Sequence, residues 1–188
     1  MITPAKQRSS PADAWHAEHA YFGKLLRLLQ REVDVFHTGE RPDYQLMLDI
    51  ISYLREFGDH FHHPREDAAF ARLKLRCPEL ELPLARLRQE HGVIARAGDA
   101  LSELLRAIVD GTLVSRAEVE TAAAMYLVYY GNHIAKEEED VVGRAAERLS
   151  SADWEAVRAA SPSQGDPLFG AAPEERYRAL RHLIATAG

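Results

Sequence analysis

Two short clusters in this sequence each place a carboxylate four residues after a histidine, in segments whose apolar residues repeat with helical spacing. They are His62-His63-Pro64-Arg65-Glu66 and His133-Ile134-Ala135-Lys136-Glu137. On an α-helix, side chains at positions i and i+4 lie on one face, so each cluster can direct an imidazole and a carboxylate at the same point. Such a pair of donors is suited to binding a metal ion.

Four predicted helices each carry a histidine on the apolar face, at a position where a leucine would otherwise lie. These are His19, His62, His91 and His133, and two of the faces add a glutamate in the same register, Glu66 and Glu137. A buried imidazole or carboxylate is unfavourable unless it is paired or coordinated. These converging positions predict a dinuclear metal site in which the two carboxylates bridge the ions.

The donor types narrow the choice of metal. Mixed imidazole and carboxylate donors favour iron, with zinc or manganese as alternatives, whereas calcium and magnesium prefer nearly all-oxygen sites. A lone buried histidine is usually an ordinary hydrogen-bonded core residue, and a lone His-x-x-x-Glu pair is usually a surface contact. The coincidence of both signals on four helices is what favours a metal over these ordinary roles.

Other polar residues near the clusters have less certain roles. His16 lies just off the apolar face and stays open as an additional ligand. His60 and His63 are expected to point away from the face of His62, toward solvent or toward a ligating group. Glu138 is the alternative to Glu137 if the helix is locally unwound. Three carboxylates are placed to accept the outer N–H of a ligating imidazole: Asp59, Asp67 and Glu90.

Three tyrosines fall within two helical turns of His133. Tyr126, Tyr129 and Tyr130 could gate the site or donate to a bound ligand, although aromatic residues at this spacing are more often core.

Four long amphipathic helices position these residues. The apolar spacing predicts helices over residues 13–36, from near 43 to 73, from after 78 to about 110 and from about 115 to 149. Short loops between such helices favour an all-α fold, an antiparallel up-down-up-down four-helix bundle with a short C-terminal helical extension. Pro64 falls inside the second helix and predicts a kink or bulge around residues 60–64.

The predicted organisation is a single domain with two flanking segments. Residues 1–12 are expected to be a flexible N-terminal segment, residues 13–150 the bundle, and residues 151–188 a helical tail packed on it, with a last helix from about Pro173 to Ile184. Ser115 and Glu118 have the spacing of a capping box at the start of the fourth helix.

Composition excludes several classes of function. The 188 residues are 46% hydrophobic and 28% charged, with a net charge of −6, which disfavours nucleic acid as a partner. No apolar run approaches the roughly 20 residues needed to span a membrane, and no secretory signal is evident. The single cysteine, Cys77, precludes an intrachain disulfide and suits the cytoplasm. A homodimer stays open.

Over about residues 14–154 the sequence resembles the hemerythrin-like, or HHE cation-binding, family of bacterial type. The resemblance rests on Glu18-His19, on His62-His63-Pro64-Arg65-Glu66, on Glu90-His91, and on His133-Ile134-Ala135-Lys136-Glu137-Glu138. It implies an oxo- or hydroxo-bridged di-iron centre held by His19, His62, Glu66, His91, His133 and Glu137. It also implies that the partner is a small diatomic molecule or peroxide, in oxygen or nitric oxide binding, sensing, iron handling or stress protection.

The sequence departs from the oxygen-carrying members at one position. Those proteins resemble this chain but have a second histidine one turn after His91, where this chain has Ala95. The missing histidine predicts a more open site and disfavours reversible oxygen carriage, unless His16 substitutes. An enzyme for peroxide breakdown or iron–sulfur cluster repair is the first alternative function. A zinc-binding or metal-free helical scaffold is the second.

Overall fold

The computed structural model describes residues 11–160, 165–170 and 174–186, and the regular structure in these ranges is all helical, with no strand. Helix α1 (Pro11–Thr38) begins two residues earlier than expected, so Pro11 and Ala12 belong to its first turn rather than to a flexible segment. The preceding residues lie outside the described ranges. After α1, Gly39 has a φ of +87°, a backbone conformation that glycine adopts without strain.

The second long helix contains a wide-turned segment beside the proposed ligands. Asp43 caps α2 (Tyr44–Tyr53), accepting a hydrogen bond of 2.9 Å from the backbone N–H of Leu46. The helix continues as a π-helix, η1 (Leu54–His62), and then as α3 (His63–Arg76). The bulge predicted around residues 60–64 is confirmed, and it extends back to Leu54. Pro64 lies in the first turn of α3, where a missing N–H is best tolerated.

The third and fourth long helices complete the framework. A short turn, η2 (Pro78–Leu80), leads into α4 (Glu81–Val109), and α5 spans Arg116–Glu137. The expected capping box is absent, because the Ser115 side chain makes no cap hydrogen bond and its backbone carbonyl accepts from Glu118 instead. A second π-helix, η3 (Glu138–Val142), joins α5 to α6 (Gly143–Arg148).

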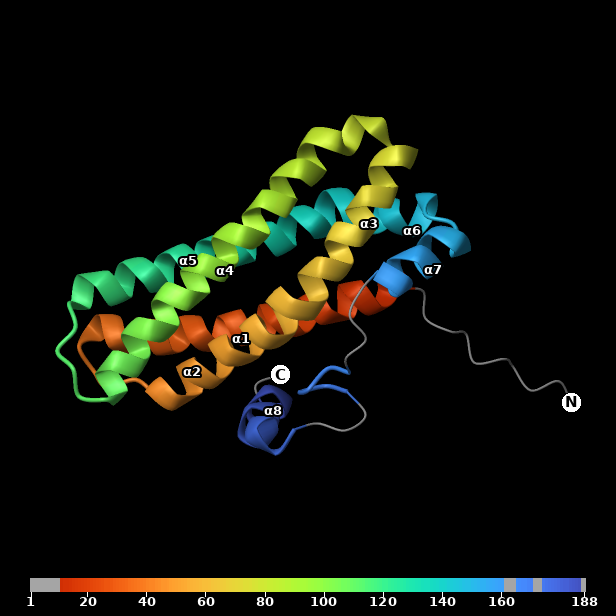
Figure 1. The fold of residues 1–188 in the computed structure, drawn as a ribbon. Coiled ribbons are helices and arrows are strands. Elements are labelled where there is room, and N and C mark those ends of the chain that lie inside the picture. The colour runs from red at the N-terminus through yellow and green to blue at the C-terminus, as the bar shows by residue number, and fades with distance from the viewer. Residues whose placement is uncertain (1–10, 161–164, 171–173, 187–188) are drawn as a thin grey trace, which may run out of the picture.

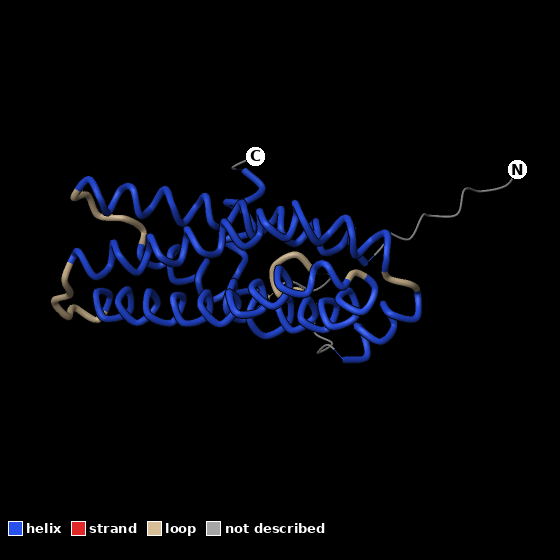
Figure 2. Tube along the Cα trace, turned by 90° about the horizontal axis from the view of Figure 1, so that it is seen from above, coloured by secondary structure: helices blue, strands red, loops and turns tan. Residues whose placement is uncertain are grey.

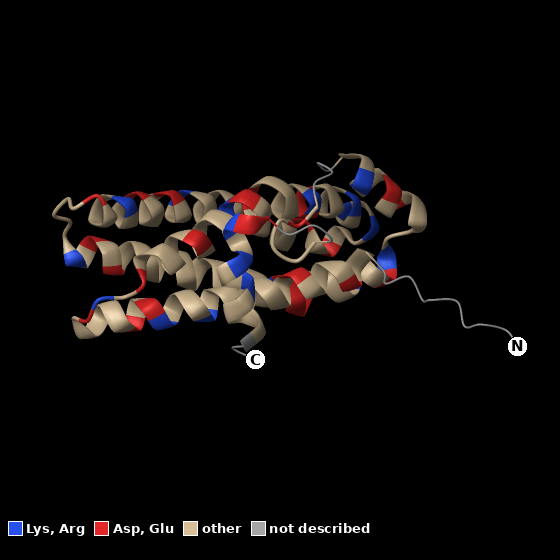
Figure 3. Cartoon of the chain, turned by 90° about the horizontal axis from the view of Figure 1, so that it is seen from below, with Lys and Arg blue, Asp and Glu red and all other residues tan. Residues whose placement is uncertain are grey.

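The long helices lie lengthwise beside one another (Figures 1 and 2). Helix α1 packs against α2 and α5, while α4 packs against α5 and, more lightly, against α2 and α3. Figure 3 shows that acidic and basic residues are interspersed along the helices. None of the helices in the described part of the chain is long and apolar enough to cross a membrane.

Two apolar clusters fill the interior, and buried histidines and carboxylates lie between them along the long helices. On α1, Phe22 belongs to one apolar cluster and Trp15 to the other, with His19 between them. On α4, Ile94 and Leu87 flank His91 in the same way. The histidines and carboxylates therefore form a polar layer across the middle of an otherwise apolar core.

The C-terminal residues pack on the outside of the long helices. Helix α7 (Ser151–Ala160) lies on α3, where Arg76 donates a hydrogen bond of 3.0 Å to Asp153. The last elements are η4 (Glu175–Tyr177) and α8 (Arg178–Thr186), which lies beside α2 (Figure 1). Pro173, the expected start of the last helix, lies outside the described residues.

Candidate metal centre

The six predicted ligands come together in the polar layer. Helix α1 supplies one, the second helix two, α4 one and α5 two. All are buried, with exposed fractions between 0% and 8%. They are His19, His62, Glu66, His91, His133 and Glu137.

Their donor atoms form two groups. In the first, His19 Nε2 lies 3.1 Å from His62 Nε2, and Glu66 Oε1 lies 3.1 Å from the former and 2.6 Å from the latter. The second group consists of His63, Glu66, His91 and His133, each offering one ligand atom within 4.8 Å of the others. Either group has the donor types and the spacing needed to hold a metal ion.

Two carboxylates connect the groups. Glu66 directs Oε1 at the first group, while its Oε2 lies 3.3 Å from His91 Nε2 in the second. Glu137 also reaches both groups: its Oε2 lies 3.3 Å from His19 Nε2 in the first, and its Oε1 lies 3.3 Å from His133 Nε2 in the second. Each carboxylate therefore places one oxygen in each group.

A carboxylate faces the outer nitrogen, Nδ1, of every histidine in the cluster. Asp59, Asp67 and Glu90 lie 3.3, 3.2 and 3.3 Å from Nδ1 of His63, His91 and His133, respectively. The sequence predicted that these three carboxylates would face ligating imidazoles. Glu138 and Glu18 make contacts of 2.6 Å with Nδ1 of His19 and His62, respectively. The contacts at His19, His62 and His133 are hydrogen bonds, and such a bond fixes the ring and leaves Nε2 to coordinate an ion.

Many of the inward-facing donor atoms lack a hydrogen-bond partner among the described residues. This applies to His63 Nε2, His91 Nε2, His133 Nε2, Glu66 Oε2 and both carboxylate oxygens of Glu137. Buried polar atoms are almost always satisfied, and leaving one without a partner destabilises a protein by about 1–3 kcal/mol. Divalent cations would satisfy these atoms together, so the residues fit a metal site. Cys77, the only thiol, is buried in an apolar cluster instead.

The electrostatics of the metal-free cluster show how strongly its members interact. Burial alone would lower the pKa of His19, but the neighbouring carboxylates of Glu137, Glu138 and Glu66 outweigh it and raise the pKa to about 11. His91 behaves alike: the carboxylates of Asp67, Glu137 and Glu66 overcome burial and raise its pKa to about 11. Both imidazoles are therefore protonated at neutral pH when no metal competes.

The pKa values of Glu66 and His63 also depend on the neighbouring charges. Burial would raise the pKa of Glu66, yet the charge of His62 and a hydrogen bond from His19 hold it well below its usual value. His63 is held neutral, because burial and the positive charge of His91 both lower its pKa. Its Nε2 is thus available to an ion without loss of a proton.

His63 corrects the expectation that it would point away from the cluster. It is 3% exposed, and its ring stacks on that of His91 at 4.2 Å between centroids. The reason is the π-helix that ends at His62, because its wider turns change the direction of the residues that follow. His60, by contrast, is exposed, as expected.

The structure also separates the alternatives at the helix ends. His16 is largely exposed, with its Nδ1 2.7 Å from Glu138 Oε2, and it belongs to neither donor group. Glu137 reaches the cluster although a π-helix begins directly after it, whereas Glu138 contacts the outer nitrogen of His19.

The aromatic residues near the cluster lie in different environments. Tyr126 and Tyr130 are buried core residues, whereas Tyr129 is 43% exposed. The ring of Tyr130 lies 5.6 Å from that of His63. Trp15, which the sequence could not distinguish from an ordinary core residue, directs its indole N–H at Glu66 Oε1 and at His19 Nε2.

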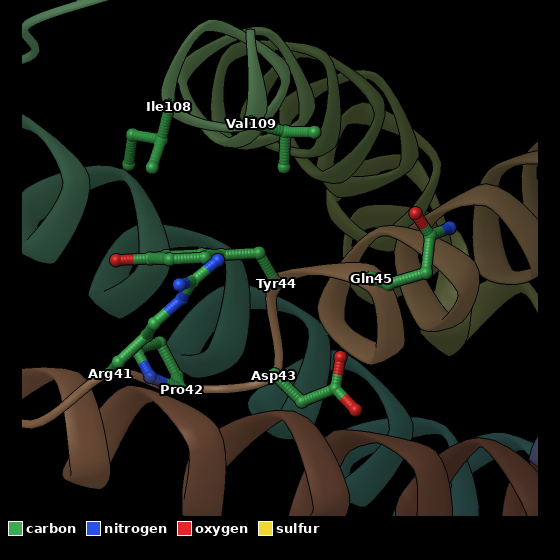
Figure 4. Close-up of a pocket in the computed structure, with 7 residues that line it drawn as sticks. All are labelled: Arg41, Pro42, Asp43, Tyr44, Gln45, Ile108 and Val109. Carbon is green, nitrogen blue, oxygen red and sulfur yellow. The ribbon is translucent and has the colours of Figure 1, made fainter. Parts of the chain in front are cut away.

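A separate hollow of about 670 Å³ lies between the start of α2 and the end of α4 (Figure 4). Arg41, Asp43, Tyr44, Ile108 and Val109 are among its lining residues. None of the histidines and carboxylates of the polar layer lines it, so it offers no access to the candidate metal centre.

Comparison with known proteins agrees with the geometry. No curated protein matches the chain. The family model for the hemerythrin HHE cation binding domain matches residues 10–145, a range that includes every residue of the two donor groups and Glu137. The chain therefore belongs to the hemerythrin HHE cation-binding domain family.

Proposed function

We propose that this protein is a non-haem di-iron protein that binds iron and a small exogenous ligand, namely oxygen, nitric oxide or peroxide. Its role would be sensing, iron handling or protection against oxidative or nitrosative stress. The observation that carries the proposal is the pair of carboxylates, Glu66 and Glu137, each with one oxygen in each of two histidine groups. Bridging carboxylates between two imidazole groups are the donors expected of a dinuclear site in an antiparallel four-helix bundle.

The ligand assignment follows from the two groups. His19 and His62 would hold the first ion, and His63, His91 and His133 the second, with Glu66 and Glu137 bridging. The first ion would have four protein donors and the second five. An exogenous ligand would therefore bind more readily at the first.

His63 changes the functional argument drawn from Ala95. The sequence indicated that one histidine of the oxygen-carrying proteins was missing, and this disfavoured reversible oxygen binding. In the structure, His63 supplies a fifth buried histidine from a different helix. Reversible oxygen binding is therefore retained among the proposed activities.

The chain's residues have distinct tasks in such a site. Bound iron would supply redox and Lewis-acid chemistry toward the small ligand. The outer carboxylates orient the imidazoles, and the apolar clusters on either side exclude bulk water. Phe22, whose ring lies 4.8 Å from that of His62, closes the site toward the larger apolar cluster.

The test is anaerobic loading with ferrous iron, followed by iron quantitation and visible spectroscopy before and after oxygen, nitric oxide and peroxide. We expect about two irons per chain and a new charge-transfer band on oxidation. His62→Ala should lose iron, while His37→Ala, at an exposed position outside the cluster, should retain it. Absence of bound iron, or binding of zinc alone, would refute the proposal. Catalytic turnover of peroxide would instead favour an enzyme.

A further inference from the structure

The indole N–H of Trp15 reaches the metal-ligating atoms of the first group. Among the described residues, no other hydrogen-bond donor does so from outside the proposed ligands. It lies one turn before His19 on α1 and is 3% exposed. Its indole N–H points at Glu66 Oε1 and lies 3.1 Å from His19 Nε2. Both atoms belong to the group that would hold the first ion.

Of these two atoms, only Glu66 Oε1 can accept the indole hydrogen bond. A protonated His19 carries a hydrogen on Nε2, and a His19 that coordinates an ion uses the Nε2 lone pair, so Nε2 accepts in neither state. An indole N–H is a donor only, and a buried donor needs an acceptor. The acceptors that remain are Glu66 Oε1 and whatever small ligand occupies a vacant position on the same ion.

We propose that Trp15 donates a hydrogen bond to a small anion bound at the two-histidine ion, and thereby selects ligands that carry an acceptor atom there. This inference rests on the proposed di-iron function. The first ion would have fewer protein donors than the second, and Trp15 directs its N–H at donor atoms of that first group. The ligand class is a small anion such as azide, fluoride, hydroxide or hydroperoxide, whose charge strengthens the bond to a neutral donor.

Packing holds the indole in this orientation. Its ring contacts Phe70 at 6.1 Å and meets Trp154 edge-to-face at 6.5 Å between centroids. A fixed donor loses little conformational freedom when the anion binds, so most of the hydrogen-bond energy contributes to affinity. Trp154 lies in the same apolar cluster as Trp15, on α7, and belongs to neither donor group, which makes it a matched control.

The experiment is an azide titration of the iron-loaded protein, followed by its charge-transfer band. Loss of one hydrogen bond to a charged acceptor should weaken azide binding by roughly ten-fold or more in Trp15→Phe. Trp154→Phe should bind azide within about two-fold of the wild type. Iron content is measured first, so that failure to load iron, which would contradict the di-iron proposal, is distinguished from failure of the Trp15 proposal.

A spectroscopic readout tests the hydrogen bond itself. Resonance Raman spectra of the azide adduct in H₂O and D₂O should differ in the wild type, and this difference should disappear in Trp15→Phe. Equal azide affinity and an equal isotope effect in the variant would overturn the proposal. So would selective loss of iron from the variant, because Trp15 would then act on metal retention through Glu66.

A second form of the protein covers the case in which Trp15→Phe fails to fold. The chain has only two tryptophans. Replacing tryptophan biosynthetically by its benzothiophene analogue in a Trp154→Phe background substitutes sulfur for the N–H of Trp15 alone and preserves its shape. This protein should show the same roughly ten-fold weakening. Unchanged azide affinity would overturn the proposal.

Discussion

At the scale of single residues, His63 would decide how many protein donors the second ion of the proposed centre receives. Its neutral imidazole stacks on His91 and offers Nε2 to the same point as His133. His63→Ala should therefore release iron from the three-histidine side, so that iron retained after gel filtration falls from about two per chain toward one. The measurement is iron quantitation together with the visible spectrum.

His60 provides the control for this prediction, because it lies three residues earlier in η1 and is exposed. His60→Ala should retain the wild-type iron content. If His63→Ala keeps two irons with an unaltered spectrum, His63 is a core residue rather than a ligand.

At the scale of elements, a glycine in the π-helix η1 leaves room for a buried tyrosine side chain of α5. Gly58 lies in η1, and a Cβ atom added to it would lie 2.6 Å from the hydroxyl oxygen of Tyr130, which is fully buried. Gly58→Ala should force the two helices apart and destabilise the protein by about 1–3 kcal/mol. Urea unfolding of the metal-free protein, followed by circular dichroism, measures this.

Two variants separate the steric cause from a general effect of glycine replacement. Gly131 lies in α5, and a methyl group added to its Cα would meet nothing within 4 Å among the described residues, so Gly131→Ala should stabilise by up to about 1 kcal/mol. Tyr130→Phe removes the contacted oxygen and should recover much of the stability that Gly58→Ala loses. Destabilisation that persists in the double variant would show that the contact is not the cause.

Beside the π-helices, the sequence did not predict the direction of every side chain. Where a helix is regular, apolar spacing of three and four predicts correctly which histidines face inward, as it did for His19 on α1 and His91 on α4. Consecutive residues of an α-helix point about 100° apart, so that periodicity allows only one of His62 and His63 to face the core. Pro64 predicted a bulge, but a proline does not reveal how far the bulge extends or which way it turns the next side chain.

Residues whose roles depend on distant partners were equally beyond the sequence. Trp15 occupies an apolar position that any large hydrophobic residue could fill, and only its approach to Glu66 gives it a polar role. The sequence predicted three of the five facing carboxylates, Asp59, Asp67 and Glu90, but not that Glu18 lies opposite His62 or Glu138 opposite His19. Composition and spacing predict which residues face inward, whereas pairing across helices depends on the packed structure.

At the scale of the whole molecule, the polar layer couples metal binding to protonation and to stability. His19 and His91 have pKa values of about 11 in the metal-free protein, so both carry a proton at pH 7. Their folded-state pKa lies above the unfolded value of about 6.5, so this stabilisation is fully present below pH 6.5 and is lost as the pH rises through 11. A bound metal requires neutral imidazoles and replaces this stabilisation with coordination.

Loading at pH 7 should therefore release at least two protons per chain, because Glu66 and Glu18 outweigh burial and raise the pKa of His62 as well. The stability gained from metal should grow as the pH rises. Calorimetric titration of ferrous iron under anaerobic conditions, in buffers of different ionisation enthalpy, measures the proton count. His91→Gln should release about one proton fewer, whereas His37→Gln, outside the polar layer, should match the wild type. Iron loading without proton release would mean that the imidazoles of His19 and His91 are neutral in the metal-free protein. Ion pairs between the imidazoles and the carboxylates would then not be what holds the polar layer together before metal binds.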